Sequence, residues 1–105
     1  MIEIDNTPRQ WDATLGPLSE DTIRAMYPRP RFRVSRSTLP PDDVATGGMV
    51  SMLCFCLAGH GTYTFGDQII SLTAGQYVRL PEGRYREETT DAPFDCVLVW
   101  ELPTP

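Results

Sequence analysis

The chain has 105 residues, of which 41% are hydrophobic and 22% charged, a composition typical of one folded domain with a small core. Its formal net charge is −5, which argues against nucleic acids and anionic membranes as partners. No apolar run approaches the about 18 residues of a membrane-spanning helix, and the first residues show no signal-peptide pattern, so we expect a cytoplasmic protein.

Residues 1–30 predict a short, partly helical N-terminal arm that packs on the main body and is not a domain of its own. Thr7 and Pro8 are typical of a helix N-cap and the first helical position, and Gly16 is expected to end that turn. Ser19 is expected to cap a second short helix. Pro28 ends it, because proline cannot continue a helix.

Residues 31–105 predict short strands separated by turns. Residues 40–48, which contain paired prolines, aspartates and glycines, are predicted as a loop. Gly66 and Asp67 form a two-residue hairpin signal between two apolar runs. Strands are predicted at 31–39, 49–58, 62–65, 68–72, 76–80, 84–88 and 94–102. About seven short strands at this spacing indicate an all-β sandwich or barrel.

The stretch "GQYVRLPEGRYR" at 75–86 resembles the second sequence motif of the cupin superfamily, G-x5-P-x-G-x2-H-x3-N. Gly75, Pro81 and Gly83 stand at the matching places, and the resemblance extends over about residues 49–102. The chain therefore resembles a small single-domain cupin. That resemblance implies an antiparallel β-barrel or jelly roll at 31–105, preceded by the arm at 1–30, with a ligand pocket at its centre. It also implies a homodimer, which would cover the free strand edges of a small barrel.

The residues that bind metal in cupins are absent from this sequence. Arg86 stands at the histidine position of the second motif, and Thr90 stands at the asparagine position. With the first motif anchored on Gly59, Met52 stands at its glutamate position. Its two histidine positions hold Thr46 and Gly48, or Ala45 and Gly47 with the longer spacer. The chain has a single histidine, His60, so we expect no metal, no cofactor and none of the metal-dependent activities of the family.

A guanidinium replaces the positive charge of a metal without its coordination chemistry. We therefore predict that Arg86 points into the barrel and binds an anion or a polarised carbonyl, with Arg79 in support. The alternative is a solvent-exposed Arg86 that pairs with Glu87, Glu88 or Glu101. Tyr77 and Arg79 share one face of their strand, which alternation alone assigns to neither pocket nor solvent.

Cys54 and Cys56 share one strand face with Met52, the face that points into the pocket in the family. They are interpreted as small residues that leave room for a ligand, with a soft-metal site and a reactive thiol as alternatives. The odd count of three cysteines argues against a closed set of disulfides. Trp100, on one face with Cys96 and Leu98, is the predicted aromatic wall of the pocket.

Three functions follow as hypotheses. The first is a metal-independent cupin-like protein that binds a small anionic or carbonyl-bearing organic molecule. The second is a metal-independent isomerase, epimerase, lyase or cyclase that uses Arg with Tyr, Glu or Cys for proton transfer. The third is an interaction module whose barrel is filled by its own side chains.

Overall fold

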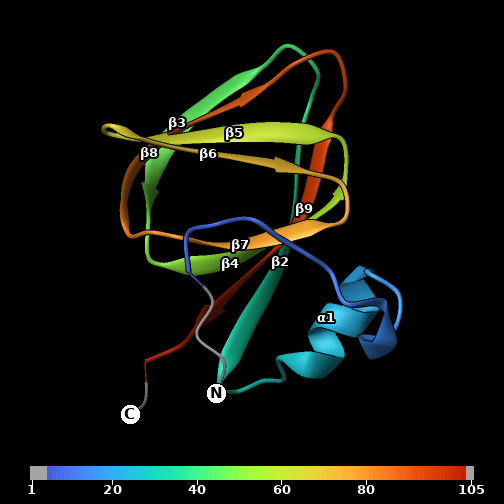
Figure 1. Ribbon diagram of the computed structural model, residues 1–105. Helices are drawn as coiled ribbons and strands as arrows, with labels where there is room; N and C mark the ends of the chain where they lie inside the picture. Colours follow the sequence, from blue (N-terminus) through green and yellow to red (C-terminus); the bar gives the residue numbers. More distant parts are fainter. Residues whose placement is uncertain (1–4, 104–105) are drawn as a thin grey trace.

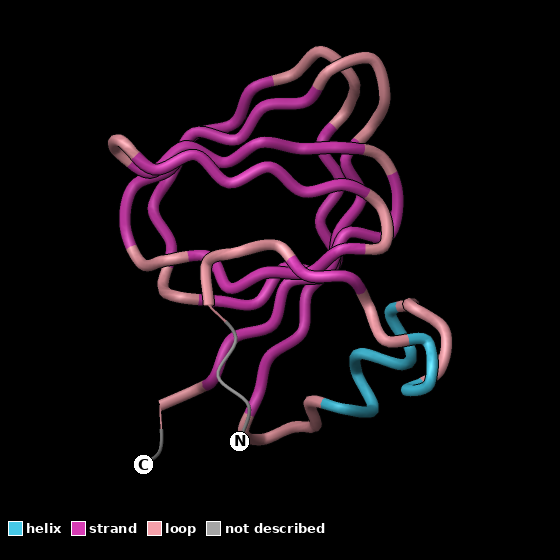
Figure 2. The backbone as a smooth tube through the Cα atoms, viewed as in Figure 1, coloured by secondary structure: helices cyan, strands magenta, loops and turns pink. Residues whose placement is uncertain are grey.

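Two antiparallel β-sheets face each other in the computed structural model, which describes residues 5–103. The first sheet contains, in spatial order, β1 (Arg9–Gln10), β7 (Gln76–Leu80), β4 (Met52–Ala58), β9 (Phe94–Glu101) and β2 (Phe32–Leu39). The second sheet contains β3 (Val44–Met49), β8 (Gly83–Thr89), β5 (His60–Phe65) and β6 (Gln68–Thr73). Figure 1 shows the two layers, and Figure 2 shows how the chain crosses repeatedly between them.

Every strand pair is antiparallel, and most consecutive strands from β2 to β9 lie in opposite sheets. This arrangement is a jelly roll. The predicted all-β fold is therefore confirmed, and so is the hairpin at Gly66 and Asp67, which joins β5 to β6. Gly66 has a φ of 59°, a left-handed conformation that glycine adopts without steric cost.

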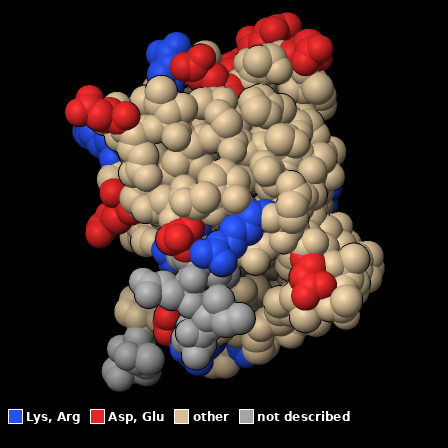
Figure 3. Space-filling model, viewed as in Figure 1, with Lys and Arg blue, Asp and Glu red and all other residues tan. Residues whose placement is uncertain are grey.

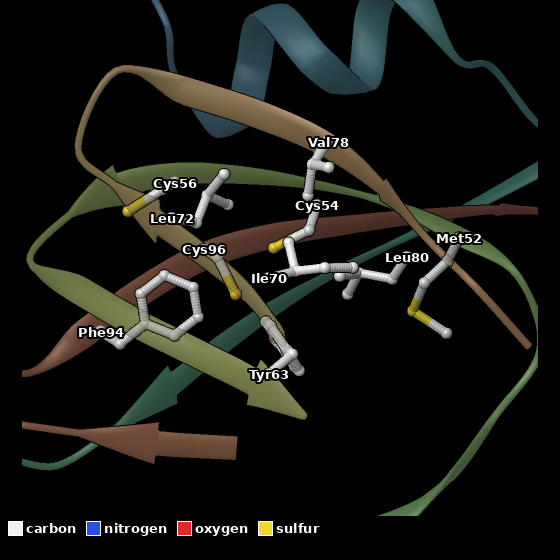
Figure 4. Close-up of a cluster of buried hydrophobic side chains, with 10 residues drawn as sticks. All are labelled: Met52, Cys54, Cys56, Tyr63, Ile70, Leu72, Val78, Leu80, Phe94 and Cys96. Carbon is white, nitrogen blue, oxygen red and sulfur yellow. The ribbon is translucent and has the colours of Figure 1, made fainter. Parts of the chain in front are cut away.

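The barrel core lies between the inner faces of the two sheets. Strand β4 shows the alternation: Met52, Cys54 and Cys56 point inward, and Leu53 and Phe55 point to the outer face of the first sheet. All five are buried because both faces of this strand are covered, which explains its continuous apolar sequence. Figure 4 shows the inner cluster, which consists of Met52, Cys54, Cys56, Tyr63, Ile70, Leu72, Val78, Leu80, Phe94 and Cys96.

The described part of the N-terminal arm covers the outer face of the first sheet. It contains β1, a 3-10 helix (Ala13–Leu15) and α1 (Glu20–Met26). Ser19 caps α1 by accepting a hydrogen bond from the backbone N–H of Thr22, as predicted. Ile23 and Trp11 pack with Phe55 in a second apolar cluster on this face.

Two sequence predictions about secondary structure are wrong. Thr7 and Pro8 do not begin a helix; they precede β1, which pairs with the edge of β7. Residues 40–48 are not all loop, because the chain turns at Asp42 and then forms β3, which pairs with β8 from Val44 to Met49. These additional strands bring the total in residues 5–103 to nine.

No helix in residues 5–103 is long and apolar enough to cross a membrane.

Candidate functional site

Strand β8 determines which charged side chain enters the barrel. It begins at Gly83, so alternation places Tyr85, Glu87 and Thr89 on the inner face and Arg84 and Arg86 on the outer face. The Arg86 side chain is 55% exposed, and its Nε donates to Glu88 Oε1 at 2.6 Å. The prediction that Arg86 points into the barrel is therefore wrong, and Glu87 takes the inner position instead.

Glu87 is the buried carboxyl of the barrel, with 7% of the residue exposed. It lies directly opposite Tyr63 of β5. Burial raises the pKa of Glu87, and a hydrogen bond with the Tyr63 side chain lowers it in part. The second carboxyl oxygen, Oε2, is the one buried side-chain oxygen or nitrogen in residues 5–103 that has no hydrogen-bond partner. A lone oxygen of this kind is costly unless it meets a ligand, a water molecule or a proton.

Three free cysteines of the first sheet belong to the same inner cluster as Tyr63 (Figure 4). Cys56 and Cys96 are direct partners across β4 and β9, and the Cys54 thiol interacts with both Cys96 and Tyr63. The interaction with Cys96, together with burial, raises the pKa of Cys54, and burial raises the pKa of Cys56 to about 11. The Cys56 thiol donates to the carbonyl of Ala58 at 3.4 Å. The raised pKa values of Cys54 and Cys56 favour the protonated thiol, which is a poor nucleophile.

The positions that correspond to the metal ligands of cupins lie beside this cluster. On β3, Ala45 is paired with Glu87, and Gly47 is paired with Tyr85, so both small residues belong to the inner row. A Cβ on Gly47 would lie 3.2 Å from the Tyr85 hydroxyl oxygen, which shows that the tyrosine ring covers this glycine. Among residues 5–103, no three His, Cys, Asp or Glu side chains are grouped as for a metal ion.

A cavity of about 420 Å³ opens at this point of the second sheet. It is lined by Thr46, Gly47, Gly48, Arg84 and Tyr85. Tyr85 separates this cavity from Glu87, which lies two residues further along the same inner row. Burial raises the pKa of Tyr85, and the negative charge of Glu87 raises it further. Glu87 is not part of the described lining of this cavity.

Arg33 makes an exposed contact with Trp100 that the sequence analysis did not identify. It is paired with Trp100 across β2 and β9, and its guanidinium carbon lies 6.0 Å from the centre of the tryptophan ring. Trp100 packs against the inner cluster, as predicted from its shared face with Cys96. The sequence does contain a signal for the face on which Arg33 lies. Arg33 alternates with the apolar Phe32 and Val34, which places the arginine on the opposite face of the strand.

Tyr77 and Arg79 lie on the outer face of the first sheet, away from the barrel interior. The Tyr77 ring stacks on Phe55 at 5.6 Å in the cluster beneath the N-terminal arm. Arg79 lines a second cavity of about 660 Å³, together with Trp100. The predicted ligand-binding residues are therefore divided: Cys54 and Cys56 lie inside the barrel, Tyr77 and Arg79 lie outside it, and Trp100 lies at the boundary.

Charges are unevenly distributed over the surface. On the face shown in Figure 3, the barrel presents a broad uncharged surface with charged side chains at its margins.

No family model and no curated protein matches the sequence, whereas solved structures do match the fold. The Cupin_2 domain of an XRE family transcriptional regulator from Enterobacter cloacae has a TM-score of 0.60 at 14% identity, over 93% of this chain and 97% of that one. A cupin protein from Bacteroides fragilis has a TM-score of 0.58 at 20% identity, over 73% and 70%.

The DMSP lyase DddQ from Ruegeria pomeroyi has a TM-score of 0.60 at 21% identity and covers 71% of this chain. The match spans only 41% of the length of that lyase. At these identities the likenesses concern the fold alone. This chain therefore has the cupin fold, built as an antiparallel jelly roll with a buried carboxyl on the inner face of β8.

Proposed function

We propose that this chain is a metal-independent, cupin-like protein that binds a small carbonyl-bearing organic molecule inside its barrel. The observation that carries the proposal is the buried Glu87 carboxyl, whose Oε2 has no hydrogen-bond partner within residues 5–103. The small inner residues of β3, Ala45 and Gly47, stand opposite Glu87 and Tyr85. A ligand that enters from the cavity at Gly47 would have to displace the Tyr85 ring to reach Glu87.

The chemistry of Glu87 favours a carbonyl over an anion as the bound group. A raised pKa increases the share of the neutral carboxylic acid, which donates a hydrogen bond to a carbonyl oxygen. The charged carboxylate would instead repel an anion. Arg86, which was expected to bind an anion here, lies on the outer face of β8. Carbonyl recognition by Glu87, with Tyr63 as its neighbour, therefore replaces anion recognition by Arg86.

One observation also favours the hypothesis of a metal-independent enzyme. A buried acid with a raised pKa beside a tyrosine is the usual setting of a general acid or base. Glu87 would then exchange a proton with the carbonyl ligand, as an isomerase or lyase requires. Conversion of a bound carbonyl compound distinguishes this function from simple retention.

The homodimer and the cytoplasmic location stay predictions.

The test is a thermal-shift screen with matched trios of compounds, each consisting of a ketone, its alcohol and its amine, such as cyclohexanone, cyclohexanol and cyclohexylamine. We expect particular ketones to raise the melting temperature of the wild type and of Glu87→Gln, since the glutamine amide still donates a hydrogen bond. The same ketones should not stabilise Glu87→Leu. A preference for amines, or equal stabilisation of Glu87→Leu, would contradict carbonyl recognition by this residue. If no compound of any class binds, the interaction module with a filled barrel becomes the better account.

A further inference from the structure

A second cavity lies outside the barrel, on the outer face of the first sheet, where β2 begins and β7 and β9 end. Its volume is about 660 Å³, within the range of about 300–1,000 Å³ that is usual for small-molecule sites. The apolar residues Leu53 and Val99 belong to its lining, and the aromatic side chains of Tyr27 and Phe32 meet edge to face there, 5.1 Å apart. The cavity thus offers apolar and aromatic surface to a flat molecule.

Charged residues of both signs line this cavity. Its described lining contains two guanidinium groups, those of Arg31 and Arg79, and one carboxylate, that of Glu101. Arg31 Nε donates to Glu101 Oε1 at 3.2 Å, but the two side chains are 57% and 58% exposed, so this pair contributes little stability and is easily exchanged. Arg79 donates to the Ser51 hydroxyl at 3.4 Å, which directs its side chain along the cavity wall.

We propose that this outer cavity binds a small aromatic carboxylate. The aromatic ring of the ligand would pack between the apolar wall and the rings of Tyr27 and Phe32. Its carboxylate would accept hydrogen bonds from the Arg79 and Arg31 guanidinium groups, whose planar forks suit a carboxylate. The Glu101 carboxylate would compete with the ligand carboxylate for Arg31. This site is separate from the proposed site inside the barrel. Glu87 lies on the inner face of β8 in the second sheet, whereas this cavity lies on the outer face of the first sheet.

The probe for the test is 2-naphthoate, with the neutral 2-naphthalenemethanol, which has no carbonyl group, as its uncharged match, measured by isothermal titration calorimetry on the full chain. We expect saturable binding of one naphthoate per chain that weakens as salt is added. Arg79→Met and Arg31→Met should each weaken binding by about tenfold, the scale of one charge-assisted contact. Glu101→Gln should strengthen it, because it frees Arg31 from its competitor.

Two control variants show whether naphthoate binds in the outer cavity or elsewhere on the protein. Arg84→Met removes a charge from the outer face of the second sheet, and Glu87→Gln changes the barrel; both should leave naphthoate binding unchanged. Circular dichroism confirms that each variant is folded, and Glu101→Gln provides a test that does not depend on losing an arginine. The proposal is overturned if naphthoate does not saturate, if 2-naphthalenemethanol binds equally well, or if Glu87→Gln weakens binding as much as Arg79→Met does.

Discussion

Tyr63 and Glu87 are direct partners across β5 and β8, and both side chains point into the barrel. Their pairing places a phenol hydroxyl and a carboxyl in the apolar space between the two sheets. Burial raises the pKa of both groups, so each tends to keep its proton. The raised pKa values favour the neutral form of both groups, in which each can donate a hydrogen bond inside the barrel.

The first prediction concerns the pH dependence of stability. The folded protein holds the pKa of Glu87 above its ordinary value of 4.5, so the folded state binds more protons than the unfolded chain above that pH. This contribution to stability is complete below pH 4.5 and is lost as pH rises through the folded pKa. Glu87→Gln should remove this loss, so the stability of the variant relative to the wild type should increase as pH rises from acidic to neutral values. Urea unfolding between about pH 4 and pH 9 measures it. Identical pH slopes in the two proteins would show that Glu87 is not buried in its charged form.

The second prediction concerns the arginines on the barrel surface. Arg86→Met should change the free energy of unfolding by less than about 0.5 kcal/mol, because its ion pair with Glu88 is exposed. The matched change Arg36→Met should cost more, about 1 kcal/mol, because Arg36 makes a two-pronged pair with Asp95 and that pair lowers the pKa of the aspartate. Urea unfolding of both variants gives the comparison. A larger loss for Arg86→Met would restore a structural role for that residue.

The third prediction uses the two adjacent glycines of β3. A Cβ on Gly48 would meet only the Gly83 carbonyl, at 4.0 Å, so Gly48→Ala should stabilise the strand by about 0.5–1 kcal/mol. A Cβ on Gly47 would stand 3.2 Å from the Tyr85 hydroxyl, so Gly47→Ala has to displace the ring and should gain less or lose stability. Thermal unfolding compares the two. Equal gains would mean that Tyr85 does not pack on Gly47.

The fourth prediction concerns the three thiols. Cys54, Cys56 and Cys96 are buried, and burial and neighbouring thiols raise the pKa of Cys54 and Cys56. The folded protein should therefore resist alkylation by iodoacetamide at neutral pH, and all three cysteines should react once guanidinium chloride unfolds the chain. Mass spectrometry counts the added groups. Rapid alkylation of one cysteine in the folded protein would favour the catalytic-thiol interpretation.

Elements with local signals were predictable from the sequence. Ser19 precedes a short helical stretch, the Gly66–Asp67 pair separates two apolar runs, and 49–58 is apolar except for Ser51. The structure has a capped helix and a hairpin at the first two places, and β4 within the third. Strand β3 was missed because its sequence, with two glycines, resembles a loop. It is a strand only because β8 supplies its hydrogen-bond partners, and this distant pairing leaves no local pattern.

The candidate site depended on the direction of one strand, which motif spacing does not determine. The Pro-x-Gly corner predicted where β8 begins, and β8 does begin at Gly83. The motif then assigned the inward position to residue 86, whereas regular alternation from Gly83 assigns it to 85 and 87. A difference of one residue exchanges the two faces of a strand, so the barrel contains Glu87 in place of Arg86. The contact of Arg33 with Trp100 was missed because it follows from the pairing of β2 with β9, which lie far apart in the sequence.

The most direct test of the account is mass spectrometry of the intact folded protein, purified without added ligand, for the wild type, Glu87→Gln and Glu87→Leu. The account predicts that the wild type carries a small, non-covalently bound organic molecule that contains a carbonyl group. That mass should persist in Glu87→Gln and be absent from Glu87→Leu, and no variant should carry a stoichiometric divalent metal. A bound metal, or the same organic mass in Glu87→Leu, would contradict the claim that Glu87 recognises a carbonyl ligand inside the barrel.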